Sequence, residues 1–261
     1  MKQIDSNFTW SFSKLSSFQT CPLEFFLQYL QDPPLPQEQN PWAEFGILCH
    51  ELLEEYAKGK LEKDMLAFEY ASRYDNIVQH HFPPYPSEYA EKTYQQGLAY
   101  FENFEGFGSQ YQVLSAEEKF EIPIRGHRFV GISDLTLRNK ETGKITVVDH
   151  KTKSESSMKS EVSLYRHQLY LYAEYVKQHY GEFPETIQFN MIKSEKPIIE
   201  RFSPERHEET LNWLEDTITD ILFETDWNPN PKQYYCKFIC SMLPYCEAGM
   251  DISQYCPRKN K

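Results

Sequence analysis

Two short apolar runs that favour β structure each carry an acidic residue, and this combination restricts the fold more than any other feature. The run at 129–137 contains Asp134, and the run at 145–150 contains Asp149. A cluster of turn-forming residues at 139–144 separates the two runs. Strands joined by such a short turn pair as an antiparallel hairpin. The sequence therefore predicts a hairpin whose strands are apolar enough to be buried and yet carry charge.

The length of the turn fixes which residues of the two strands face each other. If the turn is 140–143, counting outward places Asp134 opposite Asp149. Side chains alternate along a strand, so Lys151 lies on the same face as Asp149. Two opposed carboxylates repel each other, and burying them costs free energy unless a positive group is close. That group can be Lys151 or a divalent cation, and oxygen ligands favour Mg²⁺ or Mn²⁺.

This set of side chains has a catalytic and a structural interpretation. A cation held by two carboxylates can activate water and neutralise charge on phosphate oxygens, as phosphodiester hydrolysis requires. A neighbouring lysine can position the water or stabilise developing negative charge. The alternative is a solvated hairpin with ordinary surface charges. Val147 and Val148 precede Asp149 and favour a buried strand, which argues against the alternative.

Periodicity and turn signals predict a chain that is helical first and mixed afterwards. This order favours an α/β core with a helical N-terminal lobe. We expect one domain, 1–261, with a mostly helical part at 1–107, an α/β core at 108–225 and a Cys-rich tail at 226–261. The expected helices lie at 11–29, 42–58, 62–80, 87–104, 160–180 and 203–223, and the expected strands at 112–124, 129–137, 145–150, 186–192 and 197–202.

The overall charge and hydropathy exclude some classes of protein. The net charge is −12, which excludes a domain covered in basic surface. A local basic groove or bridging cations would still allow contact with nucleic acid. No apolar run approaches the roughly 18 residues that a membrane span needs. The first ten residues lack the basic and apolar parts of a signal peptide, so we expect a cytoplasmic protein without a membrane partner.

Four of the six cysteines crowd the end of the chain, at Cys236, Cys240, Cys246 and Cys256. In a reducing compartment, crowded thiols indicate metal or cluster ligands before disulfides. Four thiolates can hold an iron–sulfur cluster or a structural Zn²⁺, and the same residues can also be buried and unligated. The spacing alone does not separate these three alternatives.

Further segments of the chain match, in order, the motifs of one enzyme family. Together with GISDL at 131–135 and VVDHK at 147–151, they are SFSKLSSFQTCPLEFF at 11–26, GILCHELLE at 46–54, QLYLY at 168–172 and the cysteines of the tail. The chain resembles the PD-(D/E)XK nuclease superfamily, and most closely its RecB-like branch. That branch includes the AddB nuclease domain and the CRISPR-associated iron–sulfur exonucleases.

The resemblance implies a fold and a metal site. The fold is a restriction-endonuclease-like core, in which helices flank a central mixed β-sheet, with a helical N-terminal lobe and a Cys-rich C-terminal tail. In the family pattern, Asp134 and Asp149 hold Mg²⁺ or Mn²⁺ together with His50 and the backbone carbonyl of His150. Imidazole suits Mn²⁺ better than Mg²⁺, so we expect activity with Mn²⁺ to be at least as good.

The resemblance also implies roles for three further residues. Lys151 acts on the attacking water or on the transition state, and Gln168 and Tyr172 contact DNA or support the site. One helical turn separates Gln168 from Tyr172, so both side chains face the same way. The structural alternative for this pair is a helix flank packed in the core. Ser133 stands where the family name has proline, a position that holds no ligand.

The cysteine pattern resembles the four-thiolate site of a 4Fe-4S cluster in the same branch. The resemblance assigns Cys21, Cys236, Cys240 and Cys246 as its ligands. The tail has three residues between its first two cysteines, where the family pattern has two, and Cys256 could replace Cys236. Ligands drawn from both ends of the chain would close a very long loop, where the entropic gain is large in principle.

Taken together, the resemblance implies a metal-dependent DNA nuclease with a structural iron–sulfur cluster. We expect an exonuclease that acts on single-stranded DNA ends in repair or recombination, with a helicase, recombination or CRISPR protein as a possible partner. One alternative is a non-catalytic DNA-binding or recombination partner that retains the fold, and another is a zinc protein without a nucleic-acid role. The intact set of Asp134, Asp149 and Lys151 favours the enzyme, because a non-catalytic copy has no need for opposed carboxylates.

Overall fold

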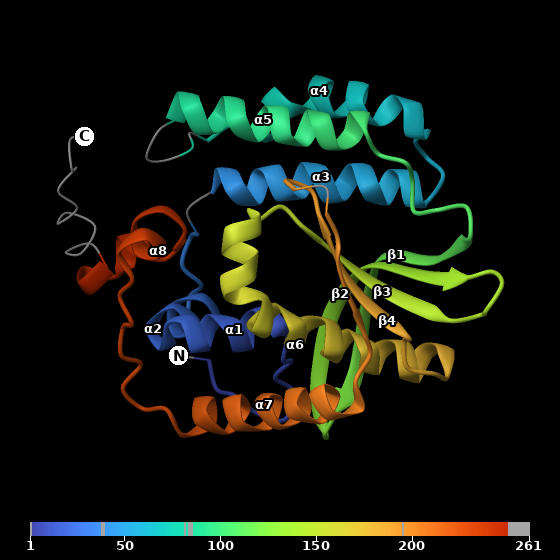
Figure 1. Ribbon diagram of the computed structural model, residues 1–261. Helices are drawn as coiled ribbons and strands as arrows, with labels where there is room; N and C mark the ends of the chain where they lie inside the picture. The colour runs from blue at the N-terminus through green and yellow to red at the C-terminus, as the bar shows by residue number, and fades with distance from the viewer. Residues whose placement is uncertain (1, 38–39, 81, 83–85, 195, 250–261) are drawn as a thin grey trace. The chain divides into compact units, whose positions relative to one another are not determined.

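The computed structural model of the chain describes residues 2–37, 40–80, 82, 86–194 and 196–249 (Figure 1). The chain divides into two units. The sheet unit is Pro41–Asn212, and the terminal unit combines Met1–Asn40 with Trp213–Lys261. No helix in the described ranges is long and apolar enough to cross a membrane.

Among the described residues of the sheet unit, five strands form one mixed sheet in the order β1-β2-β3-β4-β5. Only β3 and β4 run parallel, and the other neighbouring pairs are antiparallel. A parallel pair needs a long crossover, which the helix between β3 and β4 supplies. The predicted mixed sheet flanked by helices is confirmed. The strands are β1 (Tyr111–Ile124), β2 (His127–Asn139), β3 (Ile145–Lys151), β4 (Thr186–Met191) and β5 (Ile198–Arg201).

The register of β2 and β3 is the predicted one. The paired residues run from Arg138 opposite Ile145 to Leu135 opposite Val148. One further step in this register brings Asp134 opposite Asp149. All residues of β3 before Lys151 are buried, so the strand has no solvated face on which it could carry a charge cheaply. The hairpin turn thus brings both carboxylates to one buried position.

Helices cover both faces of this sheet. In Figure 1, α3 (Pro41–Ala57), α4 (Leu66–Ile77) and α5 (Pro86–Glu102) lie on one side, and α6 (Glu155–Tyr180) lies on the other. A 3₁₀ turn, Lys63–Met65, precedes α4. Helices α3, α4 and α5 share one apolar core, and each of them contributes buried side chains to it. Among them are Phe45, Leu48, Leu52, Tyr70 and Phe101.

Three helices differ clearly from the bounds that periodicity predicts. The helix expected at 62–80 is shorter, because α4 runs only from Leu66 to Ile77. Helix α6 begins at Glu155 rather than at 160, because Ser154 Oγ caps it by accepting a hydrogen bond from Ser157 N at 3.3 Å. The first expected helix breaks at Cys21, whose backbone is extended. Pro22 then starts a new helix, since proline fits the first turn but not a helix interior.

The terminal unit consists of short elements from both ends of the chain. An aromatic cluster holds them together, because Trp227 packs against Phe18, Phe25 and Phe26 with ring centroids 5.6–6.3 Å apart. Gln28 Nε2 also donates to Ser241 Oγ at 3.1 Å. The elements are α1 (Phe12–Thr20), α2 (Pro22–Phe25), a π-helical turn (Phe26–Leu30), part of α7 (Pro204–Phe223), α8 (Gln233–Phe238) and a 3₁₀ turn (Leu243–Tyr245).

A pair of helical glycines tests the packing of α5 against α4. A Cβ at Gly97 would lie 2.5 Å from Tyr70 Cζ, whereas a Cβ at Gly46 would meet only Thr152 Oγ1, at 3.5 Å. We expect Gly97→Ala to lower the free energy of unfolding by about 1–3 kcal/mol through overpacking. Gly46→Ala should leave it unchanged or raise it by up to about 1 kcal/mol, because alanine favours the helix. Urea unfolding measures both, and equal effects would contradict this packing.

Candidate active site

The two opposed carboxylates lie where the ladder between β2 and β3 ends. The side chains of Asp134 and Asp149 are almost fully buried. Asp134 Oδ2 accepts a hydrogen bond from the backbone N–H of His150 at 2.7 Å. Burial, and then the negative charge of Asp149, raise the pKa of Asp134 to about 7. The carboxylates therefore destabilise each other until a cation lies between them.

Lys151 is held beside Asp149 by a chain of contacts from α6. Its ammonium Nζ lies 2.7 Å from Asp149 Oδ2 and donates to Gln168 Oε1 at 2.9 Å. The amide of Gln168 in turn donates to Tyr172 Oη at 3.0 Å. The ring of Tyr165 lies beneath the ammonium, with its centroid 4.6 Å away. Lys151, Gln168 and Tyr172 thus form one continuous chain of hydrogen bonds.

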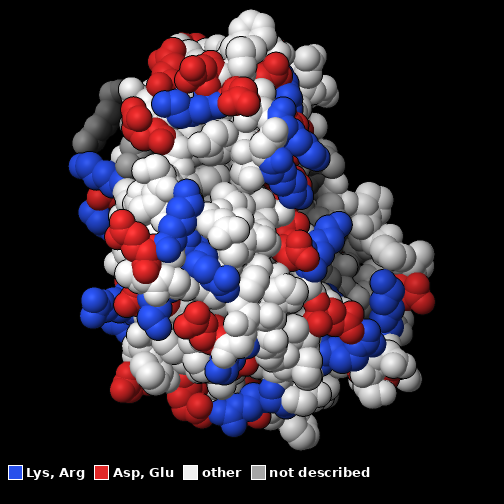
Figure 2. Space-filling view, turned by 90° about the vertical axis from the view of Figure 1, so that its right-hand side faces the viewer, with Lys and Arg blue, Asp and Glu red and all other residues white. Residues whose placement is uncertain are grey.

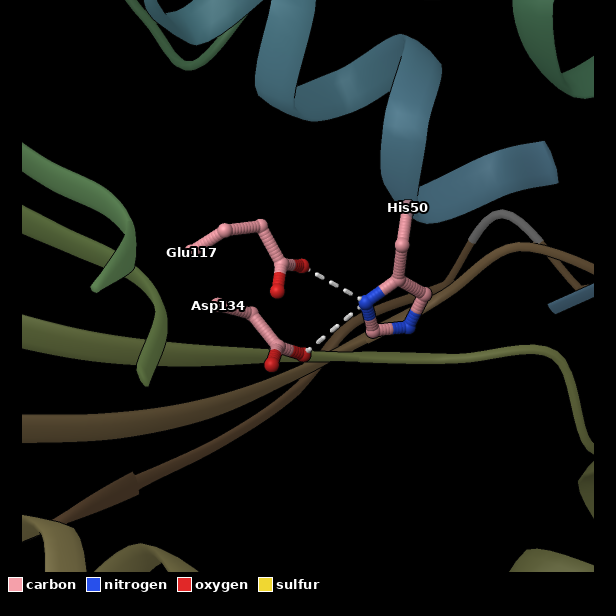
Figure 3. A group of neighbouring side chains, drawn as sticks. All are labelled: His50, Glu117 and Asp134. Carbon is pink, nitrogen blue, oxygen red and sulfur yellow. Dashed lines mark hydrogen bonds and ion pairs between the residues drawn. The ribbon is translucent and has the colours of Figure 1, made fainter. Parts of the chain in front are cut away.

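His50 approaches the carboxylates from α3 on the opposite side. Its Nδ1 lies 2.9 Å from Glu117 Oε1 and 3.7 Å from Asp134 Oδ2, as the dashed lines in Figure 3 mark. Its Nε2 lies 3.0 Å from the carbonyl oxygen of His150. Burial opposes a charge on the ring, but the hydrogen bond with Glu117 and the nearby carboxylates raise the pKa of His50 to about 9. The protonated ring can donate to both partners.

Glu117 is the member of this group that sequence analysis did not identify. It lies on β1 between Ala116, which pairs with Leu135, and Glu118, which pairs with Ser133, and so stands across from Asp134. Its φ of +47° is in the left-handed region that residues other than glycine rarely adopt. Because the alternation of β1 is loose, Glu117 resembles the exposed Glu118 in the sequence.

The donor atoms fit a divalent cation. Atoms of His50, Glu117 and Asp134 all lie within 4.8 Å of one another. Asp149 Oδ2 is buried and has no partner with hydrogen-bond geometry, although the Lys151 ammonium is near it. The 3.0 Å between His50 Nε2 and the His150 carbonyl matches neighbouring ligands of an octahedral ion with bonds of about 2.1 Å. Carboxylate, carbonyl and imidazole donors together suit Mn²⁺ or Mg²⁺.

Only the backbone of His150 takes part in this group. Its ring is buried and hydrogen-bonds through Nδ1 with the amide of Asn190 at 2.9 Å. Burial, followed by the charges of His50 and Lys151, lowers the pKa of His150 well below its ordinary value. The ring therefore has a structural role, and only the backbone carbonyl of His150 lies beside the His50 ring.

The terminal unit contains a second group of candidate ligands. Cys21, Cys236, Cys240 and Cys246 line one pocket. The sulfurs of Cys21, Cys236 and Cys246 each accept a hydrogen bond of 3.3 Å from a backbone N–H. The donors are Asn230, Lys232 and Gly249, in that order. Cys256, the alternative ligand, lies outside the described residues.

An acidic residue also lines this pocket. Glu24 is almost fully buried, with both carboxylate oxygens 2.9 Å from Tyr235 Oη. Burial raises the pKa of Glu24, a residue that sequence analysis did not identify as part of a site.

The remaining described cysteine, Cys49, follows a different pattern. It lies next to His50 in the chain and belongs to the apolar core of the sheet unit, where burial raises the pKa of its thiol. It is a packing residue, as its position in a helical apolar stripe indicates.

Two known proteins are similar to parts of this chain. One subunit of an ATP-dependent helicase/deoxyribonuclease from Carboxydothermus hydrogenoformans is 29% identical over 184 residues, which are 59% of this chain but only 17% of that subunit. This similarity supports the RecB-like branch. The protein SSO0001, known from a crystal structure, is 18% identical, with 78% of this chain and 96% of that one aligned. Its TM-score is 0.34, which is too low to support an argument about the fold.

A family model extends the similarity from these segments to most of the sequence. It covers residues 9–247 and therefore includes the hairpin carboxylates, His50 and the helix with Gln168 and Tyr172. The family model and the relative, together with the group of possible metal ligands, support a metal-dependent nuclease. The chain belongs to the PD-(D/E)XK nuclease superfamily.

Proposed function

We propose that this protein is a metal-dependent DNA exonuclease that acts on single-stranded ends. The observation that carries the proposal is the buried pair Asp134 and Asp149 beside Lys151, because such a pair is costly unless it binds a cation. The choice of DNA rests on the relative named as a deoxyribonuclease. The preference for single-stranded ends rests on the resemblance to the RecB-like branch.

The proposed ligands of the catalytic ion are Asp134, Asp149, His50 and the carbonyl of His150. When bound there, a divalent ion activates water and neutralises charge on the phosphate oxygens. We assign Glu117 a positioning role, because a ligating histidine usually donates its second ring N–H to a carboxylate. The 2.9 Å contact of Glu117 with Nδ1 leaves Nε2 to face the ion.

Besides the metal ion, we propose the positively charged side chain of Lys151 as a catalytic group. Two contacts, with Asp149 and Gln168, hold its ammonium in place, and a third N–H remains for the attacking water or a phosphate oxygen. Gln168 and Tyr172 act as positioning residues in this account. Tyr172 is buried, so the hydrogen bond to its hydroxyl orients the Gln168 amide with its oxygen toward Lys151.

We further propose that Cys21, Cys236, Cys240 and Cys246 hold a 4Fe-4S cluster. Backbone N–H donors to three sulfurs are an arrangement that favours thiolates and tunes such clusters. Four thiolates can also hold a structural Zn²⁺, and the metal content of the purified protein separates the two groups.

The named relative also suggests how the nuclease is used. That protein is a subunit of a helicase/deoxyribonuclease, and this chain matches 17% of its length. We propose that a helicase or recombination protein supplies the single strand that this chain degrades, in DNA repair or recombination. A non-catalytic DNA-binding role remains the alternative, and it predicts strand binding without cleavage.

Asp134→Asn separates catalysis from stability. We expect it to abolish cleavage of end-labelled single strands in Mg²⁺ or Mn²⁺. The metal-free variant at pH 8 should be at least as stable as the parent, because the raised pKa of Asp134 means that its ionised form costs free energy in the folded state. Melting curves with and without Mn²⁺ measure this, and the ion should no longer stabilise the variant. Cleavage at the parental rate would refute the assignment.

Glu117→Gln tests the positioning role on the metal itself. Without the carboxylate, the His50 ring is less basic and less well oriented, so Mn²⁺ affinity should fall about 10-fold to 100-fold. Titration calorimetry on the catalytically silent Lys151→Ala background measures the affinity directly. The exposed Glu118 is the matched control, and Glu118→Gln should bind Mn²⁺ as the parent does. If both variants bind alike, Glu117 has no role at the metal.

Single cysteine variants test the cluster. The purified protein should be brown, with broad absorbance in the violet–blue, and Cys21→Ala or Cys240→Ala should lose iron and melt at a lower temperature. Cys49→Ala is the control, because this buried thiol lies in the other unit and should not change the iron content. A colourless protein that contains one zinc per chain would decide against the cluster.

A further inference from the structure

Lys193 lies just beyond the sheet edge at which the parallel strands β3 and β4 end. Met191, the last residue of β4, pairs with Lys151, and Ile192 N donates to the Lys151 carbonyl at 3.0 Å. Lys193 follows directly, and its own carbonyl accepts a hydrogen bond from the amide of Gln96 at 3.5 Å. In open α/β sheets, ligands bind outside the carboxyl ends of the strands.

The Lys193 ammonium rests on two aromatic rings of α3. Nζ lies 4.6 Å from the ring centroid of Trp42 and 5.1 Å from that of Phe45. Phe82 supports this platform, with its centroid 4.5 Å from the Trp42 ring in an edge-on contact. The rings hold the long side chain in one direction and so reduce the entropy lost on binding a ligand.

No carboxylate among the described residues forms an ion pair with this ammonium. Burial, together with the positive charge of Lys92, lowers the pKa of Lys193 to about 8. Lys151 and Lys153, at the end of β3, are instead paired with Asp149 and Glu161. A partly buried cation without an anion is unusual in a chain of net charge −12.

The platform lies close to the proposed metal site. Trp42, Phe45 and His50 belong to the same helix, and His50 comes five positions after Phe45 and eight positions after Trp42. At about 1.5 Å per residue, this corresponds to about 7–12 Å along α3. Stacked nucleotides advance about 3.4 Å each, so the separation corresponds to about two or three nucleotides.

We propose that Lys193 and its aromatic platform form a phosphate subsite for the DNA strand, two or three nucleotides from the bond that is cut. The inference rests on the proposed function and extends it. On the face shown in Figure 2, basic and acidic side chains are interspersed rather than gathered in one basic surface. Lys193 is a single cation that no carboxylate among the described residues neutralises, so it can contribute to phosphate binding by itself.

Lys193→Met tests the subsite, since methionine keeps the apolar packing on the rings and removes only the charge. On the Lys151→Ala background with Mn²⁺, a labelled 20-mer single strand should bind about fivefold more weakly, and the slope of log Kd against log salt should fall by about 1. Lys193→Arg should restore most of the affinity. Lys177 also lies over a ring, that of Phe183, so Lys177→Met is the matched control and should change neither quantity.

A second measurement locates the phosphate. A neutral methylphosphonate, two or three nucleotides from the labelled end, should weaken binding to the parent but not to Lys193→Met, as a double-mutant cycle requires. Equal sensitivity of both proteins, or an unchanged salt slope in Lys193→Met, would overturn the subsite while leaving the nuclease proposal intact. Failure of the parent itself to bind single strands in a salt-dependent way would overturn both.

Discussion

One antiparallel register brings two carboxylates to the same buried position, and the rest of the sheet unit is arranged around that constraint. A four-residue turn and the pairing of Leu135 with Val148 place Asp134 directly opposite Asp149. Repulsion and lost hydration make this arrangement unfavourable by itself, as the raised pKa of Asp134 reflects. A fold can retain such an unfavourable arrangement when the arrangement serves to bind a cation, because the cation turns the repulsion between the carboxylates into a net attraction.

The two sides of the sheet hold the carboxylates in different ways. From α6, the contacts from Tyr172 through Gln168 orient Lys151 against Asp149. From α3 and β1, His50 and Glu117 approach Asp134. One side thus supplies the positive charge of Lys151, and the other supplies the ring of His50, which we propose as a metal ligand. The two chains of contacts share no residue, but charge couples them, because Asp149 acts on His50 and Lys151 acts on Asp134.

The sequence predicts the parts of this site that depend on local order. Strand alternation and turn length give the hairpin register, and an apolar helical stripe gives α3 with His50 on it. Glu117 escapes prediction because its direction depends on a left-handed backbone at one residue of β1, which turns it away from the course of its neighbour Glu118. The placement of Lys193 on Trp42 likewise depends on tertiary packing, since 151 residues separate them.

The terminal unit differs from the sheet unit in that its C-terminal elements are short. Helix α8 has six residues, none of them buried, and a helix this short has no independent stability in water. Cys21 ends α1 in an extended conformation, so its thiol leaves the helix surface and joins the pocket that the tail cysteines line. The aromatic cluster around Trp227 already joins segments from both ends of the chain. The proposed cluster, held by thiols from the same two ends, would add its binding free energy to this packing and would fix the short helix α8.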